Sequence, residues 1–561
     1  MTTAQVAIDA GGDPVPAAPA PASPPAAPAY SWPVALAYIG VSLFVALTQG
    51  VAQGFVSTNI PQVAGNLGVT TTQATWLTVA FTIPRVALPL MLVKIRMQFG
   101  LRRFAEIAVA IYLVVSLISI EAIDLRSAVL VQALSGMSAA PLSTLAFMYM
   151  LEPLPPQWKM RLGLPLVMAA ISAGPMLARV VSPPLLAGSG LAGLHALGLG
   201  LAALALGLVY YLPLTSPPRV KAIAPLDIVS WLLIAAGFGG LSATFTMGAI
   251  YWWTDTAWLG MVFAASIGAL TLAVIVELHR KAPLLDIRWL ASPTVVHLTV
   301  TLLLFRLILS EQSAGAPRMF QVLGVTQNQL MPLFAVLIVA TFAGALALIP
   351  FMEPGNVPRL HLVALAMIGI GAYMDSHATV DTRPAQMMLS QAMIAFASTL
   401  YLAPAMMQGL LSALARGPNY ILSFIITFLS TQSLGGVIGS GAFVTFINHR
   451  EAVHMQVLRE ELTTTSPMLV QQIAARSAAL APQIADGAMR RAQAVVQIAG
   501  DATTQAFVLA YNDAYRLIAL VAAGALAALV LHMFRDRLAA SFRPASPAAP
   551  ASSQINRTEP K

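Results

Sequence analysis

Long apolar segments follow one another along most of this chain, separated by short polar connections. A helix of about 20 apolar residues crosses the hydrocarbon core of a bilayer, and segments of that size recur from Trp32 to near the C-terminus. The sequence therefore predicts an all-α membrane protein. We expect fourteen transmembrane helices, at 33–55, 74–95, 104–122, 127–150, 160–182, 190–213, 226–248, 256–277, 294–316, 330–351, 360–376, 386–408, 418–446 and 508–534.

Composition agrees with this pattern. Of the 561 residues, 58% are hydrophobic and only 9% are charged, which is too little polar surface for a soluble protein of this size. The net charge of +8 is spread over short loops rather than gathered in one stripe, so it does not indicate a nucleic-acid partner. Cysteine is absent, which excludes disulfides, thiolate metal sites and cysteine nucleophiles.

Basic residues occur in alternate loops, as expected for cytoplasmic loops. The connections at 57–73 and 251–258 contain no Lys or Arg and are assigned to the outer face. Both termini are therefore predicted to be cytoplasmic. The cytoplasmic loops hold Lys94, Arg96, Arg102, Arg103, Lys159, Arg161, Arg219, Lys221, Arg280, Lys281 and Arg288.

One outer connection, Asn448 to about Gln505, is much longer than the others. Met455, Leu458 and Leu462 follow helical spacing, and Ser466 before Pro467 is typical of a helix start. We expect two or three amphipathic helices outside the membrane. An unstructured insertion is the alternative.

Four segments in the right order resemble the fourteen-spanner drug:proton antiporters of the major facilitator superfamily, the Emr/Qac-type multidrug exporters. NIPQVAGNLGVTTTQATW at 59–76 is similar to the outer loop before the second span, and VELHRKAPLLDIRWL at 276–290 is similar to the amphipathic cytoplasmic connector. PRMFQVLGVTQNQL at 317–330 and SLGGVIGSGAFVTFINHREAVH at 433–454 are similar to the loop before the tenth span and the end of the thirteenth.

The resemblance implies a major facilitator fold, with two six-helix bundles and two extra helices, in a bacterial inner membrane. It also implies small-molecule and proton transport without a cofactor, and a periplasmic adaptor protein of a tripartite efflux system as a partner that docks on the long outer connection. The expected parts are a disordered Pro/Ala-rich tail at 1–30, an N-terminal bundle at 31–213, two extra helices with a connector at 214–290, five helices of the C-terminal bundle at 291–447, a helical insertion at 448–505, a last span at 506–540 and a disordered tail at 541–561.

The sequence keeps parts of the family motifs and departs from others. In AGPMLARVVSPPLL at 173–186, the motif residues Gly174 and Pro175 are kept, but Ala178 and Arg179 stand where the family has two small residues. The loop after the second span keeps Gly100 and its bases but lacks the family's aspartate. At the acidic position of the first span stands Ala52, and two positions where the family has arginine are Gln132 and Gln432.

Ionisable residues inside spans are costly, at roughly 2.5 to 3.5 kcal/mol each, and are therefore candidates for function. Arg85 lies near the middle of the second span between Pro84 and Pro89. It either faces a substrate or caps backbone carbonyls that the prolines free. Arg306 and Glu311 in the ninth span are separated by about 140° around a continuous helix, so each is expected to face another helix.

Glu311 is predicted to be the only carboxylate well inside a span and is the candidate proton-coupling residue. The alternative is that it only pairs with Arg306, Arg318 or a neighbouring helix. Arg179 can reach the headgroups, and Met406 is either a pocket residue or simple packing. Asp227, Glu277 and Asp286 are expected at the cytoplasmic interface. The candidate substrate-binding residues are Arg85, Gln53, Gln132, Arg306, Gln391 and Gln432.

The sequence contains no P-loop, no HExxH and no GxSxG in a strand-turn-helix context, so neither an ATP-driven pump nor an enzyme is expected. The leading hypothesis is a secondary exporter of amphipathic organic compounds that uses alternating access. Intramembrane arginines without matching acids favour anions, whereas lipophilic cations are the family's usual substrates. A transporter fold that has lost coupling, and acts as a docking partner or sensor, is the alternative from another class.

Overall fold

The computed structural model describes residues 30–541 apart from 216–218, 220, 281–282 and 462–465, and all regular secondary structure in this part is helical. The tails predicted at 1–30 and 541–561 lie outside the described residues except for Tyr30 and Ser541, and so does Leu462. Eleven helices are long and apolar enough to cross a membrane, or up to twelve when α3 (Thr71–Ala87) and α4 (Pro89–Phe99) count as one span bent by 50°.

The sequence predicts fourteen spans, and two long helices are the places where the remaining crossings are expected. The 48 residues of α8 (Leu164–Tyr211) are two helices that meet at a kink at Gly190, where φ is 63°. At about 1.5 Å per residue this length is more than twice the roughly 30 Å hydrocarbon core, so α8 supplies two spans. The other crossing is α18 (Pro418–Glu461), which packs between α9, α12 and α20.

The N-terminal half places α1 (Trp32–Thr58) against α6 (Leu125–Leu151) and α8, with α3 against α6 and α5 (Leu101–Ile118) against α8. α1 and α8 touch through small residues: a Cβ on Gly174 would lie 2.6 Å from the Cα of Gly50. The two backbones therefore approach closely at the kept motif glycine. Gly100 has φ 86° and separates α4 from α5. The short helices α2 (Ile60–Leu67) and α7 (Pro156–Trp158) lie in connections.

The two extra helices, α9 (Pro225–Tyr251) and α10 (Ala257–Leu278), pack on each other, and α9 also contacts α3 and α18. Asp227 at the start of α9 is fully buried and accepts from Lys94 at 2.6 Å and from Arg280 at 2.5 Å. Arg280 also pairs with Glu277 at 2.7 Å. Asp227 and Glu277, which the sequence places at the cytoplasmic interface, are thus buried in a network that fastens α9 and α10 to α4.

The C-terminal half contains α15 (Gln327–Leu348), α16 (Val357–Asp375), α17 (Met388–Leu414), α18 and α20 (Gly487–Ser541), with the short α11 (Ile287–Leu290) before it. The ninth span is not one helix, as predicted, but three: α12 (Pro293–Ile308), α13 (Glu311–Ala314) and α14 (Ala316–Val322). The two halves meet where α8 packs on α15 and where α3 packs on α18.

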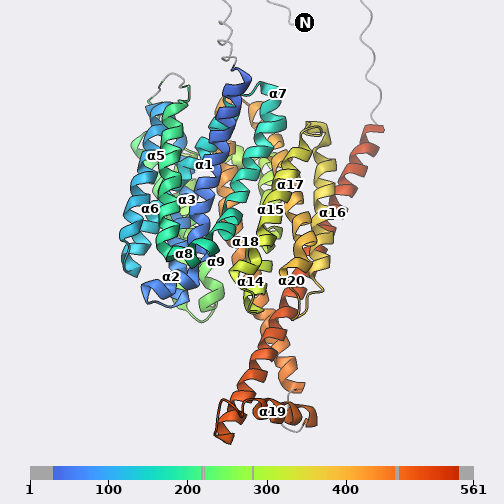
Figure 1. Cartoon of the computed structure of the whole chain (residues 1–561). Helices are drawn as coiled ribbons and strands as arrows, with labels where there is room; N and C mark the ends of the chain where they lie inside the picture. Colours follow the sequence, from blue (N-terminus) through green and yellow to red (C-terminus); the bar gives the residue numbers. More distant parts are fainter. Residues whose placement is uncertain (1–29, 216–218, 220, 281–282, 462–465, 542–561) are drawn as a thin grey trace, which may run out of the picture.

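The outer insertion is built differently from the prediction. α18 and α20 do not end near 446 and begin near 508 but continue out of the bundle as unbroken helices of 44 and 55 residues. Only α19 (Pro467–Ala479) is separate, and it begins at Pro467 after the N-cap Ser466, as the sequence indicates. Figure 1 shows this helical hairpin projecting from the end of the bundle opposite the start of α1, with α19 at its tip.

The close approach of α1 and α8 generates a stability prediction. Gly174→Ala should lower the free energy of unfolding by about 1 to 3 kcal/mol, because the added methyl group must push the α1 backbone away. The matched control is Gly198→Ala, also on α8, where a Cβ meets nothing within 4 Å. Thermal unfolding of the purified proteins in detergent measures the difference, and equal midpoints for the two variants would contradict the proposed contact.

Candidate functional site

Arg85 lies on α3 and is held by two amides from α1. Its Nη1 donates to Gln53 Oε1 at 2.6 Å and its Nη2 donates to Gln49 Oε1 at 2.8 Å. Ser143 of α6 also donates to Gln49 Oε1, at 3.2 Å. These partners are neutral, so they satisfy the guanidinium without cancelling its charge.

The prolines around Arg85 shape its position. Pro84 lies inside α3, and Pro89 begins α4 at the 50° bend. The bend turns α4 away just below Arg85, which stays half-buried beside the ring of Phe81 at 5.5 Å. None of its hydrogen bonds to the described residues goes to a carbonyl that the prolines free.

Arg306 lies on α12 in the other half of the molecule. Its Nε donates to the backbone carbonyl of Gln432 on α18 at 3.1 Å. A Cβ on Gly436 would lie 3.1 Å from Arg306 Nη2, so the glycine leaves room for the guanidinium against α18. Arg306 is close enough to Arg85 for the two cations to repel each other. The two halves thus contribute one arginine each to the same region.

A second pair of arginines also has one member in each half of the molecule. Its member in the N-terminal half is Arg179 of α8. Its guanidinium lies 5.0 Å from the ring centroid of Phe334 on α15, across the interface of the two halves. Arg318 of α14 is exposed and interacts repulsively with Arg179.

None of these four arginines forms an ion pair with a carboxylate among the described residues, although other cations of the chain do. Their neighbours are amides, a carbonyl and aromatic rings. Guanidinium groups bind carboxylates and other oxyanions strongly when these arrive with matching geometry. The interface of the two halves therefore carries positive charge that an anion would neutralise.

The remaining candidates fall into separate places. Gln132 of α6 is half-buried and has no side-chain hydrogen bond to the described residues. The side-chain amide nitrogen of Gln432 is buried without a partner, and only its backbone carbonyl meets Arg306. Gln391, expected with the cavity lining, is fully buried between two carboxyl groups in the C-terminal half, Glu311 and Asp375.

Asp375 is the residue that sequence reasoning missed. It is the last residue of α16 and is buried, and it shares Gln391 with Glu311, so Glu311 is not the only buried carboxyl group in this part of the structure. Its position at the end of a predicted span resembled an interfacial residue. The sequence around Asp375 does not have enough apolar residues on both sides to indicate that its carboxyl group is buried.

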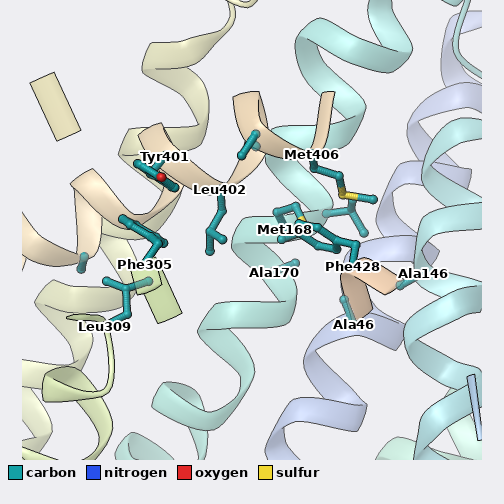
Figure 2. Packing of buried hydrophobic residues seen from close by; sticks show 14 of the residues in the cluster. Ala46, Ala146, Met168, Ala170, Phe305, Leu309, Tyr401, Leu402, Met406 and Phe428 are labelled. Carbon is teal, nitrogen blue, oxygen red and sulfur yellow. The ribbon is translucent and has the colours of Figure 1, made fainter. Parts of the chain in front are cut away.

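The cytoplasmic ends of the two halves are in contact. Arg161, before α8, donates to Glu353, before α16, at 2.5 Å. Deeper in the bundle, Met168, Met406 and Phe428 come from α8, α17 and α18 and point toward one another in one buried apolar cluster (Figure 2). Met406 packs in this cluster, and an exposed ion pair together with this apolar layer joins the two halves on the same side of the bundle.

Comparison with known proteins identifies the fold and no closer relationship. No family model matches the sequence, and no curated protein matches it. Among solved structures, tetrameric PepTSo2 is similar with a TM-score of 0.52 and 12% identity, over 90% of this chain and 99% of that one. The POT family transporter PepTSo is similar with a TM-score of 0.51 and 14% identity, over 90% and 99%. The chain therefore has the fold of these two transporters, the major facilitator fold.

The cytoplasmic ion pair predicts a specific crosslink. Arg161→Cys combined with Glu353→Cys should be joined by a short bifunctional thiol reagent, because the two side chains meet and the chain has no other cysteine. The two halves, cut at a protease site introduced into the connection between α8 and α9, should then stay together on a denaturing gel. Arg161→Cys with Asp501→Cys, at opposite ends of the molecule, is the control. No crosslink in the first pair, or an equal one in both, would contradict this closure.

Proposed function

We propose that the chain is a secondary exporter of amphipathic organic anions, such as anionic drugs or aromatic and organic acids, which works by alternating access in the bacterial inner membrane and is coupled to protons. The observation that carries the proposal is the set of four arginines at the interface of the halves without a carboxylate partner in the described chain. Alternating access suits this placement, because the site lies where the two halves of the fold move against each other.

Charge supports an anion over the lipophilic cation that the resemblance to drug:proton antiporters implies. A cation at Arg85 and Arg306 would meet two like charges, and the family's acidic residue of the first span is replaced by Ala52. An anion beside one guanidinium gains roughly 4 kcal/mol at about 4 Å and an effective dielectric constant of about 20. The amides of Gln49 and Gln53 hold Arg85 in place without competing for that charge.

The direction of transport follows the same charge argument. An anion that leaves an inside-negative cell moves down the membrane potential, which supplies about 2.3 kcal/mol per charge per 100 mV. A proton that enters in exchange adds the same amount again. Export of anions therefore needs less free energy from proton entry than export of cations does. This agrees with the missing acid of the first span.

Two substitutions test the role of charge at Arg85. Arg85→Ala should raise the apparent Km for salicylate about tenfold or more, since a hydrogen bond to a charged group contributes roughly 1.5 to 3 kcal/mol. Gln53→Glu should have a similar effect, because the new carboxylate would neutralise Arg85 at 2.6 Å. Flux into proteoliposomes measures both, with uncharged salicylamide as the matched compound.

The control is Gln53→Ala, which removes the contact and adds no charge. It should change salicylate flux much less than Gln53→Glu. Equal losses for salicylate and salicylamide in Arg85→Ala, with a lowered melting temperature, would assign Arg85 a structural role. Absence of flux for the wild-type protein with anions and lipophilic cations alike would favour the docking or sensing alternative.

We also propose that the hairpin of α18, α19 and α20 docks a periplasmic adaptor protein, as the resemblance to Emr-type exporters implies. Apolar side chains on its surface support a protein partner: Val457, Met468 and Val496 are exposed. A groove of about 520 Å³ lies among α18, α19, α20 and Val380, and it combines apolar Leu458 and Ile498 with the ion pair of Arg476 and Asp501.

Shortening the hairpin tests this partner. Leu458 and Ile498 line the same groove from facing helices, so residues between them can be replaced by a short Gly/Ser turn. The shortened protein should insert and reach the membrane at the wild-type level but lose resistance to exported compounds and co-purification with the adaptor. Unchanged co-purification would show that the adaptor docks elsewhere. Met468→Ser with Val496→Ser is the milder variant that leaves the hairpin's length intact.

A further inference from the structure

A cluster of ionisable groups lies apart from the arginines, where α13, α16 and α17 meet in the C-terminal half. Glu311, Asp375 and Gln391 are 1%, 3% and 1% exposed. Gln391 Nε2 donates to Glu311 Oε1 at 2.5 Å and to Asp375 Oδ2 at 2.8 Å. One amide group therefore holds two carboxyl groups from two other segments of the chain.

No cation among the described residues forms an ion pair with this cluster. Neither carboxyl group forms an ion pair with a described residue. Ser390 of α17 donates to Asp375 Oδ1, whereas the second oxygen of Glu311, Oε2, is buried without any partner. Buried polar oxygens without partners are rare, and a charged one is much costlier than a neutral one.

The groups on surrounding elements do not supply the missing charge. Tyr515 of α20 is buried near both carboxyl groups, and a phenol cannot supply a positive charge. Arg306 of α12 bonds to Gln432 on α18, and exposed Arg318 of α14 lies near Tyr511. The other nearby titratable groups also bond elsewhere: exposed His377 interacts with the Tyr373 carbonyl, and Asp513 pairs with Arg450 and His454.

Two carboxylates that share a low-dielectric site cannot both be ionised at small cost. The cheaper state keeps one proton on the pair, so that a single negative charge remains for the amide of Gln391 and the hydroxyl of Ser390 to stabilise. The unpartnered Glu311 Oε2 is the atom at which a neutral acid relieves the largest penalty.

We propose that Glu311 and Asp375, joined through Gln391, form one proton-binding site that holds a single exchangeable proton, and that this pair rather than Glu311 alone couples the transporter to protons. The inference rests on the proposed function only in one respect, namely that the proton drives the export of anions. The proton binds to a carboxylate oxygen and leaves from it, and no other bond forms or breaks.

The helix breaks of the ninth span give this site a link to the anion site. α12 ends at Ile308 and carries Arg306 in its last turn, while α13 begins at Glu311 and is one turn long. A shift of α12 when an anion binds Arg306 would therefore move Glu311 relative to Asp375 on α16. Separating the two carboxyl groups lowers their repulsion and lets both ionise, so that the proton leaves.

Infrared difference spectroscopy tests the pair directly on the full chain in lipid vesicles. A step in pH should change the carbonyl band of a protonated carboxyl group in the wild-type protein, and Glu311→Gln and Asp375→Asn should each remove that change. Labelling the wild-type protein with ¹³C-aspartate should shift part of the band, which tests Asp375 even if a variant folds poorly. Asp501→Asn, in an exposed ion pair of the hairpin, is the matched control and should leave the change intact.

Transport provides the second measurement, with salicylate as the probe. Both variants should lose salicylate efflux driven by a pH gradient by at least tenfold, while salicylate exchange at equal pH on both sides persists. This split separates loss of coupling from loss of the anion site, because a structural defect would reduce both.

Several outcomes would overturn the inference. Wild-type gradient-driven efflux in Asp375→Asn, together with its loss in Glu311→Gln, would leave Glu311 as a lone carrier. An aspartate label that shifts neither the carboxyl band nor the carboxylate bands of the pH-dependent change would exclude Asp375, and efflux driven by Na⁺ instead of a pH gradient would replace the proton by a metal ion. If wild-type protein carries no salicylate but the infrared change is lost in both variants, the proton site stands and the proposed substrate class fails.

Discussion

A charge inside the hydrocarbon core has no water to solvate it, so each one must find a partner in the protein or await one from outside. The charges of this chain meet this requirement in two different ways. At the cytoplasmic ends, Asp227 is paired with Lys94 and Arg280 and serves only to fasten α9 and α10. At the interface of the two halves, Arg85 and Arg306 are supported by amides and a carbonyl, which keep the cations in place and leave their charge available.

The geometry of α1 makes this arrangement possible. Gly50 and Gly54 lie four residues apart and face α8, where added Cβ atoms would meet Gly174 and Ala178. Gln49 and Gln53 lie one residue before each glycine, about 100° around the helix, and face Arg85 instead. The same two turns of α1 thus provide a smooth surface for packing and a polar surface for the arginine. A small residue in place of Arg179 is not needed for this contact.

The arginines at the interface of the halves are kept apart from the buried acids of the C-terminal half. The arginines lie where the halves meet, whereas Glu311 and Asp375 lie within the C-terminal half around Gln391. If they neutralised each other, neither group could respond to a ligand, because a paired charge has little affinity left for an anion or a proton. The broken segment of α12, α13 and α14 connects the two sites, since it carries Arg306 on one side of the break and Glu311 on the other.

The sequence by itself determined the membrane class, the order of the long apolar helices, and the start of α19 at Ser466 and Pro467. These follow from local properties: the length of apolar segments and one helix cap. The sequence also identified Arg306 and Glu311 as residues that need partners from other helices. Only the tertiary structure decided which residues are those partners.

Gln391 is 80 residues from Glu311, and Asp375 is 16 residues from Gln391 across a turn between helices, so their meeting depends on how α13, α16 and α17 pack. Hydropathy along the chain gives no information about such distances. It also could not show that α18 and α20 continue unbroken beyond the membrane, because polar residues end a hydrophobic segment without ending the helix. Burial of a charge is a property of the packed bundle. The hydropathy pattern along the chain indicates only which residues can form the helices of that bundle.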